Sequence, residues 1–332
     1  MNTPEPPPAV PSAPAPVHSA SATIAYVAVA LVTIVVPMLG AACAVWLLSR
    51  EGISGIDLGL LLGLYLFTIL GVELGYHRYL THRTLKARRW LKRVLIIGGV
   101  MAADGPPLWW AAIHRRHHAH GDHAGDPHSP NEYGHGLRAE LAGWWHAHIA
   151  WMFKPAYTAA HTTFYAKDLL RDPDLLSIDR FYVWWVALGL ALPAAVGGLV
   201  GGSWHAAWTG FIWGGLTRMC LGQHALWWGI ITLCHTIGTR PFNTPDSSRN
   251  NVLVAVLFLG DGWHNNHHAF PGSAKVGFRW WEFDPTWWVV VLFRRLGWVG
   301  DVAVPSRETI DARRGADRWP STGSDPARQL VI

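Results

Sequence analysis

Long uncharged, apolar runs alternate along the chain with polar segments that are rich in histidine. The first run, 23–48, has no charged residue and is long enough for a helix that crosses a bilayer with some tilt. After a short connector, the run at 58–72 is again apolar, and we expect its helix to continue through Glu73 to His77. These two helices predict a membrane hairpin that carries His77 just beyond the lipid.

A second hairpin is predicted from a longer uncharged stretch. From residue 181 to residue 217 there is no Asp, Glu, Lys or Arg, and glycine pairs near residue 200 divide this stretch without adding charge. A tight turn at the glycines leaves one span before it and one after it, and the second span continues to His235. The pattern predicts an all-α integral membrane protein with four spans in two hairpins.

The two ends of the chain are polar. Residues 1–22 hold seven prolines and no Lys or Arg, and we expect a disordered tail there. Residues 306–332 are predicted to form a second polar, disordered tail. A single membrane domain would then occupy 23–305, and within it Trp144, Trp145 and Trp151 indicate a helix that lies in the membrane interface.

The charged residues are few and unevenly distributed. Half of the residues are hydrophobic, 15% are charged, and the net charge is +5. Between Arg78 and Arg93 there are seven Lys/Arg residues and no acid. By the positive-inside rule this loop is cytoplasmic, and an even number of spans puts both termini on that side. A basic run beside membrane spans is suited to anionic lipid or to an acidic partner, and we expect no nucleic acid.

Eight histidines form three clusters. His114, His117 and His118 stand at helical spacings i, i+3 and i+4, which place them on one face of a helix. His264, His267 and His268 repeat this spacing, and His77 and His82 form an earlier pair. One such group alone would fit a solvated helix face. Three groups together predict a metal site, because imidazole is the commonest metal ligand.

Other residues bear on this metal site. Histidine ligands usually donate their second ring nitrogen to a carboxylate or carbonyl, and Glu73, Asp122, Asp126 and Asp261 lie near the clusters in sequence. The three cysteines have no CxxC spacing and indicate neither a disulfide framework nor a thiolate metal site. Of the histidines outside the clusters, His128 is the strongest candidate for a contact with metal.

Together the clusters resemble the three histidine boxes of the integral-membrane fatty acyl desaturases, with the closest likeness to the delta-nine branch. The boxes are His77-Arg-Tyr-Leu-Thr-His82, His114-Arg-Arg-His-His118 and His264-Asn-Asn-His-His268. The likeness covers roughly residues 25–305. It extends to the segments Asp126-Pro127-His128, Gly238-Thr-Arg-Pro-Phe242, Asn250-Asn251 and Gly262-Trp263.

The resemblance implies a function and a site. It implies a helical cap on the cytoplasmic side that holds two non-haem irons, with His235 as the ninth ligand and no catalytic group other than the metal ligands. The implied reaction uses O2 and two electrons to introduce a cis double bond into a saturated acyl chain, which is bound as a CoA thioester or a membrane lipid. A separate electron donor is expected, of the ferredoxin, rubredoxin or cytochrome b5 type.

Two positions depart from the family pattern. Ile231 stands one turn before His235, where the family usually has an Asn that reaches a metal through water. We expect Ile231 to face the metals. Ala112-Ile113 replace an Arg-Asp pair that contacts the CoA-bearing substrate in animal acyl-CoA members, which weakens the case for CoA and leaves an acyl chain of a membrane phospholipid as a serious candidate. Trp110 keeps an aromatic side chain where the family has one and is expected to line the entry of the acyl chain.

Other functions remain open from the sequence. A di-iron lipid hydroxylase would use the same boxes and yield an alcohol in place of an alkene. A non-enzymatic membrane protein that binds or transports metal would be expected to carry ionisable residues within its spans, whereas these spans are nearly free of them. A structural scaffold would leave the clustered histidines without a role.

Overall fold

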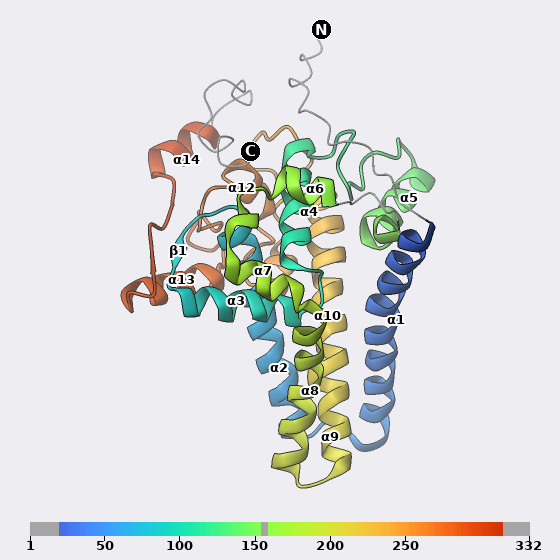
Figure 1. Cartoon of the computed structure of the whole chain (residues 1–332). Helices are drawn as coiled ribbons and strands as arrows, with labels where there is room; N and C mark the ends of the chain where they lie inside the picture. The colour runs from blue at the N-terminus through green and yellow to red at the C-terminus, as the bar shows by residue number, and fades with distance from the viewer. Residues whose placement is uncertain (1–19, 154–158, 315–332) are drawn as a thin grey trace.

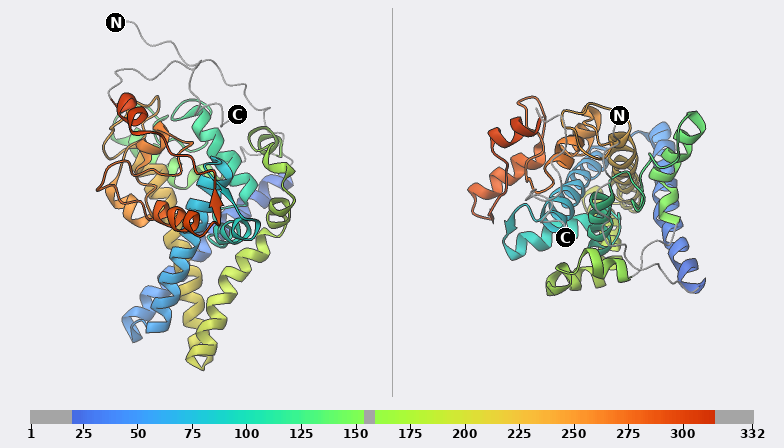
Figure 2. Two further views of the ribbon diagram at one scale, coloured as in Figure 1. Left: turned by 90° about the vertical axis from the view of Figure 1, so that its left-hand side faces the viewer. Right: turned by 90° about the horizontal axis from the view of Figure 1, so that it is seen from above.

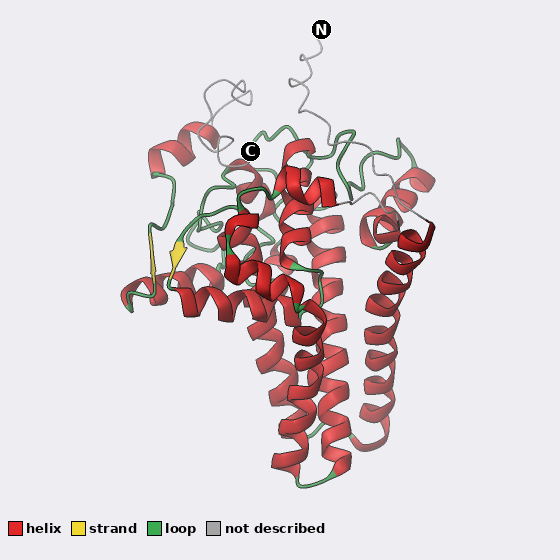
Figure 3. Ribbon diagram, in the orientation of Figure 1, coloured by secondary structure: helices red, strands yellow, loops and turns green. Residues whose placement is uncertain are grey.

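The computed structural model describes residues 20–153 and 159–314, and it is built almost entirely of helices (Figures 1 and 3). Long helices run side by side, and a cap of shorter helices and loops covers one end of them (Figure 1). The strands β1 (Lys86–Ala87) and β2 (Val299–Gly300) form one short antiparallel pair within the cap. The all-α architecture predicted from the sequence is therefore found.

Within the described residues, three helical stretches are long and apolar enough to cross a membrane: Tyr26–Glu51, Gly55–Thr81 and Tyr182–Gly201. They belong to α1 (Ala20–Glu51), to α2 (Gly55–Leu70) with its π-helical continuation η1 (Gly71–Thr81), and to α8 (Tyr182–Gly201). Apolar side chains on these helices are exposed in the isolated chain, as lipid-facing residues are expected to be; Leu199, for example, is 85% exposed. The chain is therefore suited to a membrane.

The fourth predicted span is divided between α-helical and π-helical turns. It comprises α9 (Trp204–Gly210), η4 (Phe211–Thr217), α10 (Arg218–His224), η5 (Ala225–Thr232) and the 3-10 turn η6 (Leu233–His235). Its one cation, Arg218, is buried and donates hydrogen bonds to the carbonyl oxygens of Gly214, Met101 and Gly189. These bonds satisfy the guanidinium inside the bundle, but a span here remains a prediction.

A π-helical segment at the end of the second long helix, which is wider than an α-helix, brings His77 and His82 together. His82 follows His77 by five positions, which is about 140° around a regular α-helix. The helix ends at Thr81, but its last eleven residues, η1, are wound as a π-helix, and the His82 N–H donates to the His77 carbonyl at 3.1 Å. This i to i+5 bond stacks residues five apart on one face. The apolar pattern gave no sign of this widening.

The cap contains the remaining helices, which connect through loops above the bundle (Figure 2). The segment Gly105-Pro106-Pro107 separates two of them. Their bounds are α3 (Arg89–Met101), α4 (Pro107–His120), α5 (Leu137–His148), η2 (Ala150–Phe153), α6 (Ala159–Tyr165), η3 (Leu169–Arg171), α7 (Pro173–Arg180), α11 (Val252–Leu257), α12 (His264–Ala269), α13 (Pro285–Arg295) and α14 (Arg307–Arg314).

Close helix packing holds the cap on the bundle. A side chain added at Gly71 would meet the backbone of Gly99 at 2.2 Å, and one at Gly75 would meet the carbonyl of Leu95 at 2.7 Å. Only glycine therefore lets α3 cross η1 at this distance. Among the described residues, η1, α3, α4 and η5 all contribute to one large cluster of buried apolar side chains.

Acids of the same chain neutralise most of the basic run. Six of its seven cations form ion pairs, for example Lys92 with Asp172 at 2.8 Å and Arg78 with Asp284 at 2.9 Å. The other paired cations are Arg83, Lys86, Arg89 and Arg93. The acidic partner that the sequence suggested for this run is thus largely the chain itself.

The tail predicted at the C-terminal end begins with an ordered helix. Residues 307–314 form α14, and its Ile310 is buried against Phe242 and Phe270. The expected disorder from residue 306 is therefore wrong for these eight residues, because one apolar residue anchors an otherwise polar segment. Most of the predicted N-terminal tail, 1–19, and residues 315–332 lie outside the described residues.

Both turns of the predicted hairpins lie at the end opposite the cap (Figure 1). If the cap is cytoplasmic, the uncharged α8–α9 turn lies on the outer side of the membrane. Trp204→Cys in this turn should then react with a membrane-impermeant maleimide in intact cells. Ser306→Cys, exposed beside α14, should react only after the membrane is opened. Both variants need a background without native cysteines, and labelling of both from one side would contradict this topology.

Candidate metal centre

The nine histidines expected to bind metal come together in two buried groups. Within each group the candidate ligand nitrogens all lie within 4.8 Å of one another. The five-histidine cluster consists of His77, His82, His114, His118 and His267. The four-histidine cluster consists of His117, His235, His264 and His268.

The two HxxHH motifs each contribute to both clusters. On α4, His114 and His118 are one helical turn apart and enter the five-histidine cluster, while His117 points into the other. On α12 the division is reversed, because His264 and His268 enter the four-histidine cluster and His267 crosses to the first. The exchange ties the clusters into one centre and assigns each histidine to a group, which the sequence did not.

The imidazoles face one another through their Nε2 atoms. Successive Nε2 atoms are 2.9–3.1 Å apart in both clusters, including His77 to His267 at 3.1 Å and His264 to His235 at 3.1 Å. Two nitrogens that bind one metal ion at right angles are separated by about 3 Å, since each lies about 2.1 Å from the ion. The spacing therefore suits a shared cation at the centre of each cluster.

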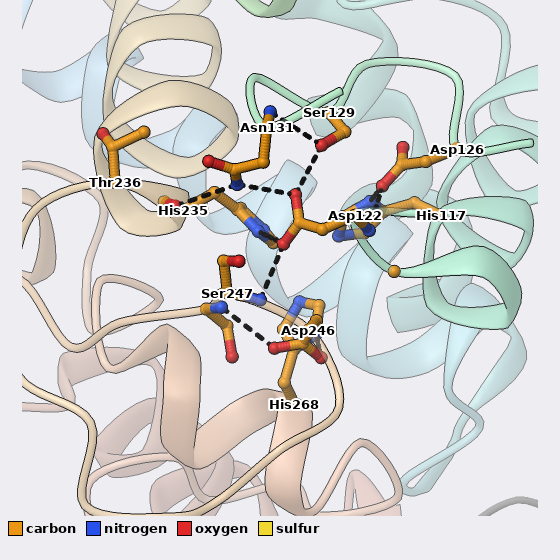
Figure 4. Close-up of polar contacts among 12 residues, drawn as sticks. His117, Asp122, Asp126, Ser129, Asn131, His235, Thr236, Asp246, Ser247 and His268 are labelled. Atoms are coloured by element: carbon orange, nitrogen blue, oxygen red, sulfur yellow. Dashed lines mark hydrogen bonds and ion pairs between the residues drawn. The ribbon is translucent and has the colours of Figure 1, made fainter. Parts of the chain in front are cut away.

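Carboxylates fix the orientation of three members of the four-histidine cluster (Figure 4). The Nδ1–H groups of His117, His235 and His268 donate to Asp126, Asp122 and Asp246 at 2.8, 2.8 and 2.7 Å. A neutral ring that donates from Nδ1 carries a lone pair on Nε2. Three lone pairs thus point into one buried space, and a cation removes the repulsion between them.

The Asp122 carboxylate is itself held by several donors. Ser129 Oγ donates to one oxygen at 2.6 Å, and the Ser247 N–H donates to the other at 2.8 Å (Figure 4). Burial raises the pKa of Asp122, but His235 and these hydrogen bonds outweigh burial and hold the pKa well below its usual value. The carboxylate stays ionised and fixes the tautomer of His235.

Sequence proximity identified most of the carboxylates at the centre but not all of them. Asp126 contacts a histidine of the neighbouring box as expected, whereas Asp122 contacts His235 from a distant segment. Asp261 lies 3.3 Å from His77, and Glu73 lies 3.9 Å from the same ring. Asp246 was missed, because it stands alone in a loop. The conspicuous segments on either side of it, 238–242 and 250–251, were the only signal.

The asparagines inside the third box brace the loop that carries Asp246. Asn265 bonds both the N–H and the carbonyl of Phe242, at 2.9 and 3.1 Å. Asn266 donates to Glu282 at 2.9 Å and accepts from Asn250 at 2.8 Å. The histidine spacing gives these asparagines no role, yet they fix α12 and its histidines against the surrounding loops.

Several imidazoles at the centre are kept neutral, whereas at His235 burial is outweighed by the Asp122 carboxylate, which raises the pKa above its usual value. Burial, reinforced by neighbouring imidazoles, holds the pKa of several rings well below its usual value. These rings are His114, His118, His264 and His267. Neutral imidazole is the form that binds metal. No cysteine joins either cluster in the described part of the chain, so the donors are nitrogens with nearby carboxylates, which suit iron, copper or zinc.

His128 lies beside the centre, as its position in the sequence suggested. Its ring is 4.7 Å from that of His117, and its Nδ1 is 3.7 Å from Asp126. Burial and His117 lower its pKa to about 3. Other histidines are elsewhere; His148, for example, pairs with His224 at 3.2 Å.

A cavity of about 440 Å³ adjoins both clusters. Its walls come from α1, α4, η2, the start of α8 and η5, and they are almost wholly apolar. Trp110 lines it and stacks on His114 with ring centroids 4.9 Å apart, which agrees with the expected position beside the substrate. Ile231 also lines the cavity, together with His235 and His264, so it faces the centre rather than lipid.

One acid in this cavity lacks any partner. Asp104, in the turn between α3 and α4, is 7% exposed, and neither carboxyl oxygen has a hydrogen bond. Burial raises its pKa to about 7, and the opposing effect of Arg218 is smaller. The sequence pattern drew no attention to this residue.

The class of protein is defined by a helical membrane-type scaffold, two histidine clusters that could hold metal ions and an adjoining apolar cavity. Residues 56–296 match the family described as Fatty acid desaturase. The chain belongs to the fatty acid desaturase family and is an oxidoreductase of that kind.

Curated relatives differ in the carrier of the acyl chain that their names specify. The chain is 40% identical over 282 residues to a hex-5-enoyl-[acyl-carrier protein] acetylenase of Moorena producens (strain JHB), covering 84% of this chain and 87% of the relative. It is 38% identical to an acyl-CoA C20 Delta5-desaturase of Anemone leveillei, and the match covers 72% of this chain and 70% of that relative. It is 35% identical to an sn-1 stearoyl-lipid 9-desaturase of Anabaena variabilis, and the match covers 72% of this chain and 80% of that relative.

Asp104→Asn should change the pH dependence of stability. The pKa of Asp104 is about 7 in the folded chain against 3.8 ordinarily, so the folded state binds the extra proton and loses stability as pH rises from about 4 to 7. This difference in the pKa of Asp104 corresponds to a loss of roughly 4 kcal/mol at most in the free energy of unfolding. Asn cannot ionise, so the variant should melt higher than the parent at pH 8 and by a clearly smaller margin at pH 5. Detergent-solubilised protein serves for this measurement, with exposed Glu140→Gln as the control. An equal effect at both pH values would contradict the assignment.

Proposed function

We propose that the protein is a membrane-bound di-iron fatty acyl desaturase. One observation carries this proposal: nine imidazoles, seven of them buried and two half-buried, converge in two linked clusters beside an apolar cavity. Two non-haem irons would be held by His77, His82, His114, His118 and His267 on one side and by His117, His235, His264 and His268 on the other. The proposal places the cap and both termini in the cytoplasm.

The donor set is suited to iron. Neutral nitrogen ligands with carboxylates behind them fit a divalent ion, and the fixed tautomers keep the lone pairs directed inward before any ion is bound. When bound, the iron pair would supply the activation of O2 and the power to remove hydrogen from an unactivated methylene. The residues of the chain orient the ligands, exclude water and hold the acyl chain.

The cavity supports a saturated acyl chain as substrate. A methylene offers no polar handle, so its position relative to the clusters must come from the shape of the apolar wall. Removal of two hydrogens from neighbouring carbons of the acyl chain leaves a cis double bond. O2 is reduced to two waters by these two hydrogens together with two electrons from the donor and two further protons. We assign the double bond to the delta-9 position, which the names of several relatives support.

The two electrons would come from a separate protein of the ferredoxin, rubredoxin or cytochrome b5 type. The sequence suggested that an acidic carrier would dock on the basic run. Because six of the seven cations there are paired within the chain, this run offers little free charge for docking. We therefore attribute docking to shape and hydrophobic contact more than to this run.

Expression in a host without its own desaturase tests the proposal. New cis monounsaturated chains, located by mass spectrometry after derivatisation of the double bond, are expected. Hydroxylated chains would instead favour the di-iron hydroxylase. Neither product, with metal still bound, would favour a protein that binds or transports metal without catalysis.

Asp246→Asn should reduce iron content and activity together. The amide cannot hold the His268 tautomer as the carboxylate does at 2.7 Å, and loss of such a partner typically costs about 10- to 100-fold in metal affinity or activity. Elemental analysis of the purified protein should give about two irons per chain for the parent and less for the variant. Asp301→Asn, at an exposed ion pair, is the matched control and should retain both irons. Zinc alone in an active parent protein would reject the iron assignment.

Ile231→Asn should be tolerated and keep its iron. Ile231 lines the cavity near His235 and His264, so an amide there would face the centre, where it could bond a water. Ile96→Asn is the control, because Ile96 is buried in the same core but does not line the cavity, and an unpaired amide there should cost about 1–3 kcal/mol. Thermal melting and iron content of both variants decide the matter; equal loss in both would contradict the prediction.

A further inference from the structure

The acyl-chain cavity reaches the outside of the molecule at α1 and at the first turn of α8. Val29 is 63% exposed and Val183 is 71% exposed. They are the only exposed residues among the described residues that line the cavity. Tyr26 and Thr33 on α1 and Tyr182 on α8 are half-buried beside them and lead inward. The mouth of the cavity is therefore formed by two helices and not by the loops of the cap.

Both helices at the mouth are suited to crossing a membrane. Tyr26–Glu51 and Tyr182–Gly201 are two of the three stretches with the necessary length and hydropathy. At this level α1 is the outermost long helix (Figure 1), and it packs on η4 and α10, whereas α8 packs on α9 and η4. Exposed Trp184 flanks the mouth at the start of α8, as aromatic residues do at the level of lipid head groups. The mouth would face the bilayer near its surface.

The charges around the cavity are unsuited to a phosphate-bearing carrier. None of the described lining residues is Lys or Arg, and the ionisable ones besides histidine and tyrosine are the acids Glu73, Asp104 and Asp261. CoA and the phosphopantetheine of a carrier protein carry phosphates, which proteins bind with Arg or Lys. The interior next to Trp110 is equally apolar, since Ala112 and Ile113 are buried there. An acyl chain attached to a bilayer lipid needs no such cations at the mouth.

We propose that the substrate is an acyl chain of a membrane lipid, which enters the cavity sideways from the bilayer between α1 and α8. The ester end would stay at head-group level near Val29 and Val183, and the methylenes would extend past Trp110 to the histidine clusters. This inference rests on the proposed desaturase function and names the carrier that the function leaves open. A CoA or carrier-protein thioester is the competing substrate.

Tryptophan substitutions at the mouth test the route. Val29→Trp and Val183→Trp fill the opening, and Val32→Trp and Val200→Trp are matched controls. The control residues lie on the same helices, are 61% and 66% exposed, and do not line the cavity. A desaturase-lacking host first incorporates labelled stearate into its phospholipids, fatty acid synthesis is then blocked, and the protein is induced. Labelled double bonds should appear in the preformed phospholipid, with a loss of about tenfold or more in the mouth variants and less than about twofold in the controls.

Photo-crosslinking gives a measurement that does not depend on turnover. Purified protein in phosphatidylcholine vesicles containing a diazirine-labelled acyl chain should be labelled at cavity residues such as Trp110 and Ile230. Val29→Trp should reduce this labelling and Val32→Trp should not. A diazirine acyl-CoA should label the same residues poorly.

The outcomes separate this inference from the proposed function. Double bonds confined to the thioester pool, or mouth variants that match their controls, would overturn lateral entry and leave desaturation intact. Unsaturated thioesters formed before any unsaturated phospholipid would do the same. If the parent protein forms no unsaturated chain in any pool, both proposals fail.

Discussion

The structure depends on keeping many imidazole lone pairs directed at one another inside a buried space. Left alone, such an arrangement is repulsive, and rotation of a ring or a change of tautomer would relieve it. Carboxylates prevent ring rotation and tautomer change at three of the rings, because each Nδ1–H donates a hydrogen bond to an acid. His268, for example, donates to Asp246 at 2.7 Å. The acids are in turn held by loop donors such as Ser129 and the Ser247 N–H. The loops of the cap therefore act as the framework of the centre.

The same constraint accounts for the unusual helix geometry. Ligands must arrive from several elements at nearly one point, whereas a regular α-helix places residues five apart on different faces. The π-helical end of the second long helix brings His77 and His82 into one cluster. A change from π-helical to 3-10 turns likewise precedes His235. Glycine-mediated contact with α3 holds the widened segment in place, and the cap and the bundle are thereby fixed to each other.

Local sequence spacing predicted the parts of the centre that are local in structure. The HxxHH spacing placed α4 and α12, and all nine expected histidines meet. Features that depend on distant segments were not visible. Asp246 has no signal of its own, and the acids that neutralise the basic run, such as Asp172 and Asp174, lie about eighty residues away in sequence. The π-helical widening leaves the apolar pattern unchanged, so hydrophobic periodicity could not show it.

The division of polarity within the cavity gives the site its specificity. At one end are neutral nitrogens kept free of protons by burial, and at the other is a mouth of exposed valines on membrane-type helices. Between them an apolar wall contains one unpartnered acid, Asp104, whose carboxyl is favoured in its neutral form by the same burial. An ionic group brought into this space would lose its hydration without finding a cation. An acyl chain gains by leaving water or lipid for a fitted wall, so the cavity selects for length and shape and selects against charge.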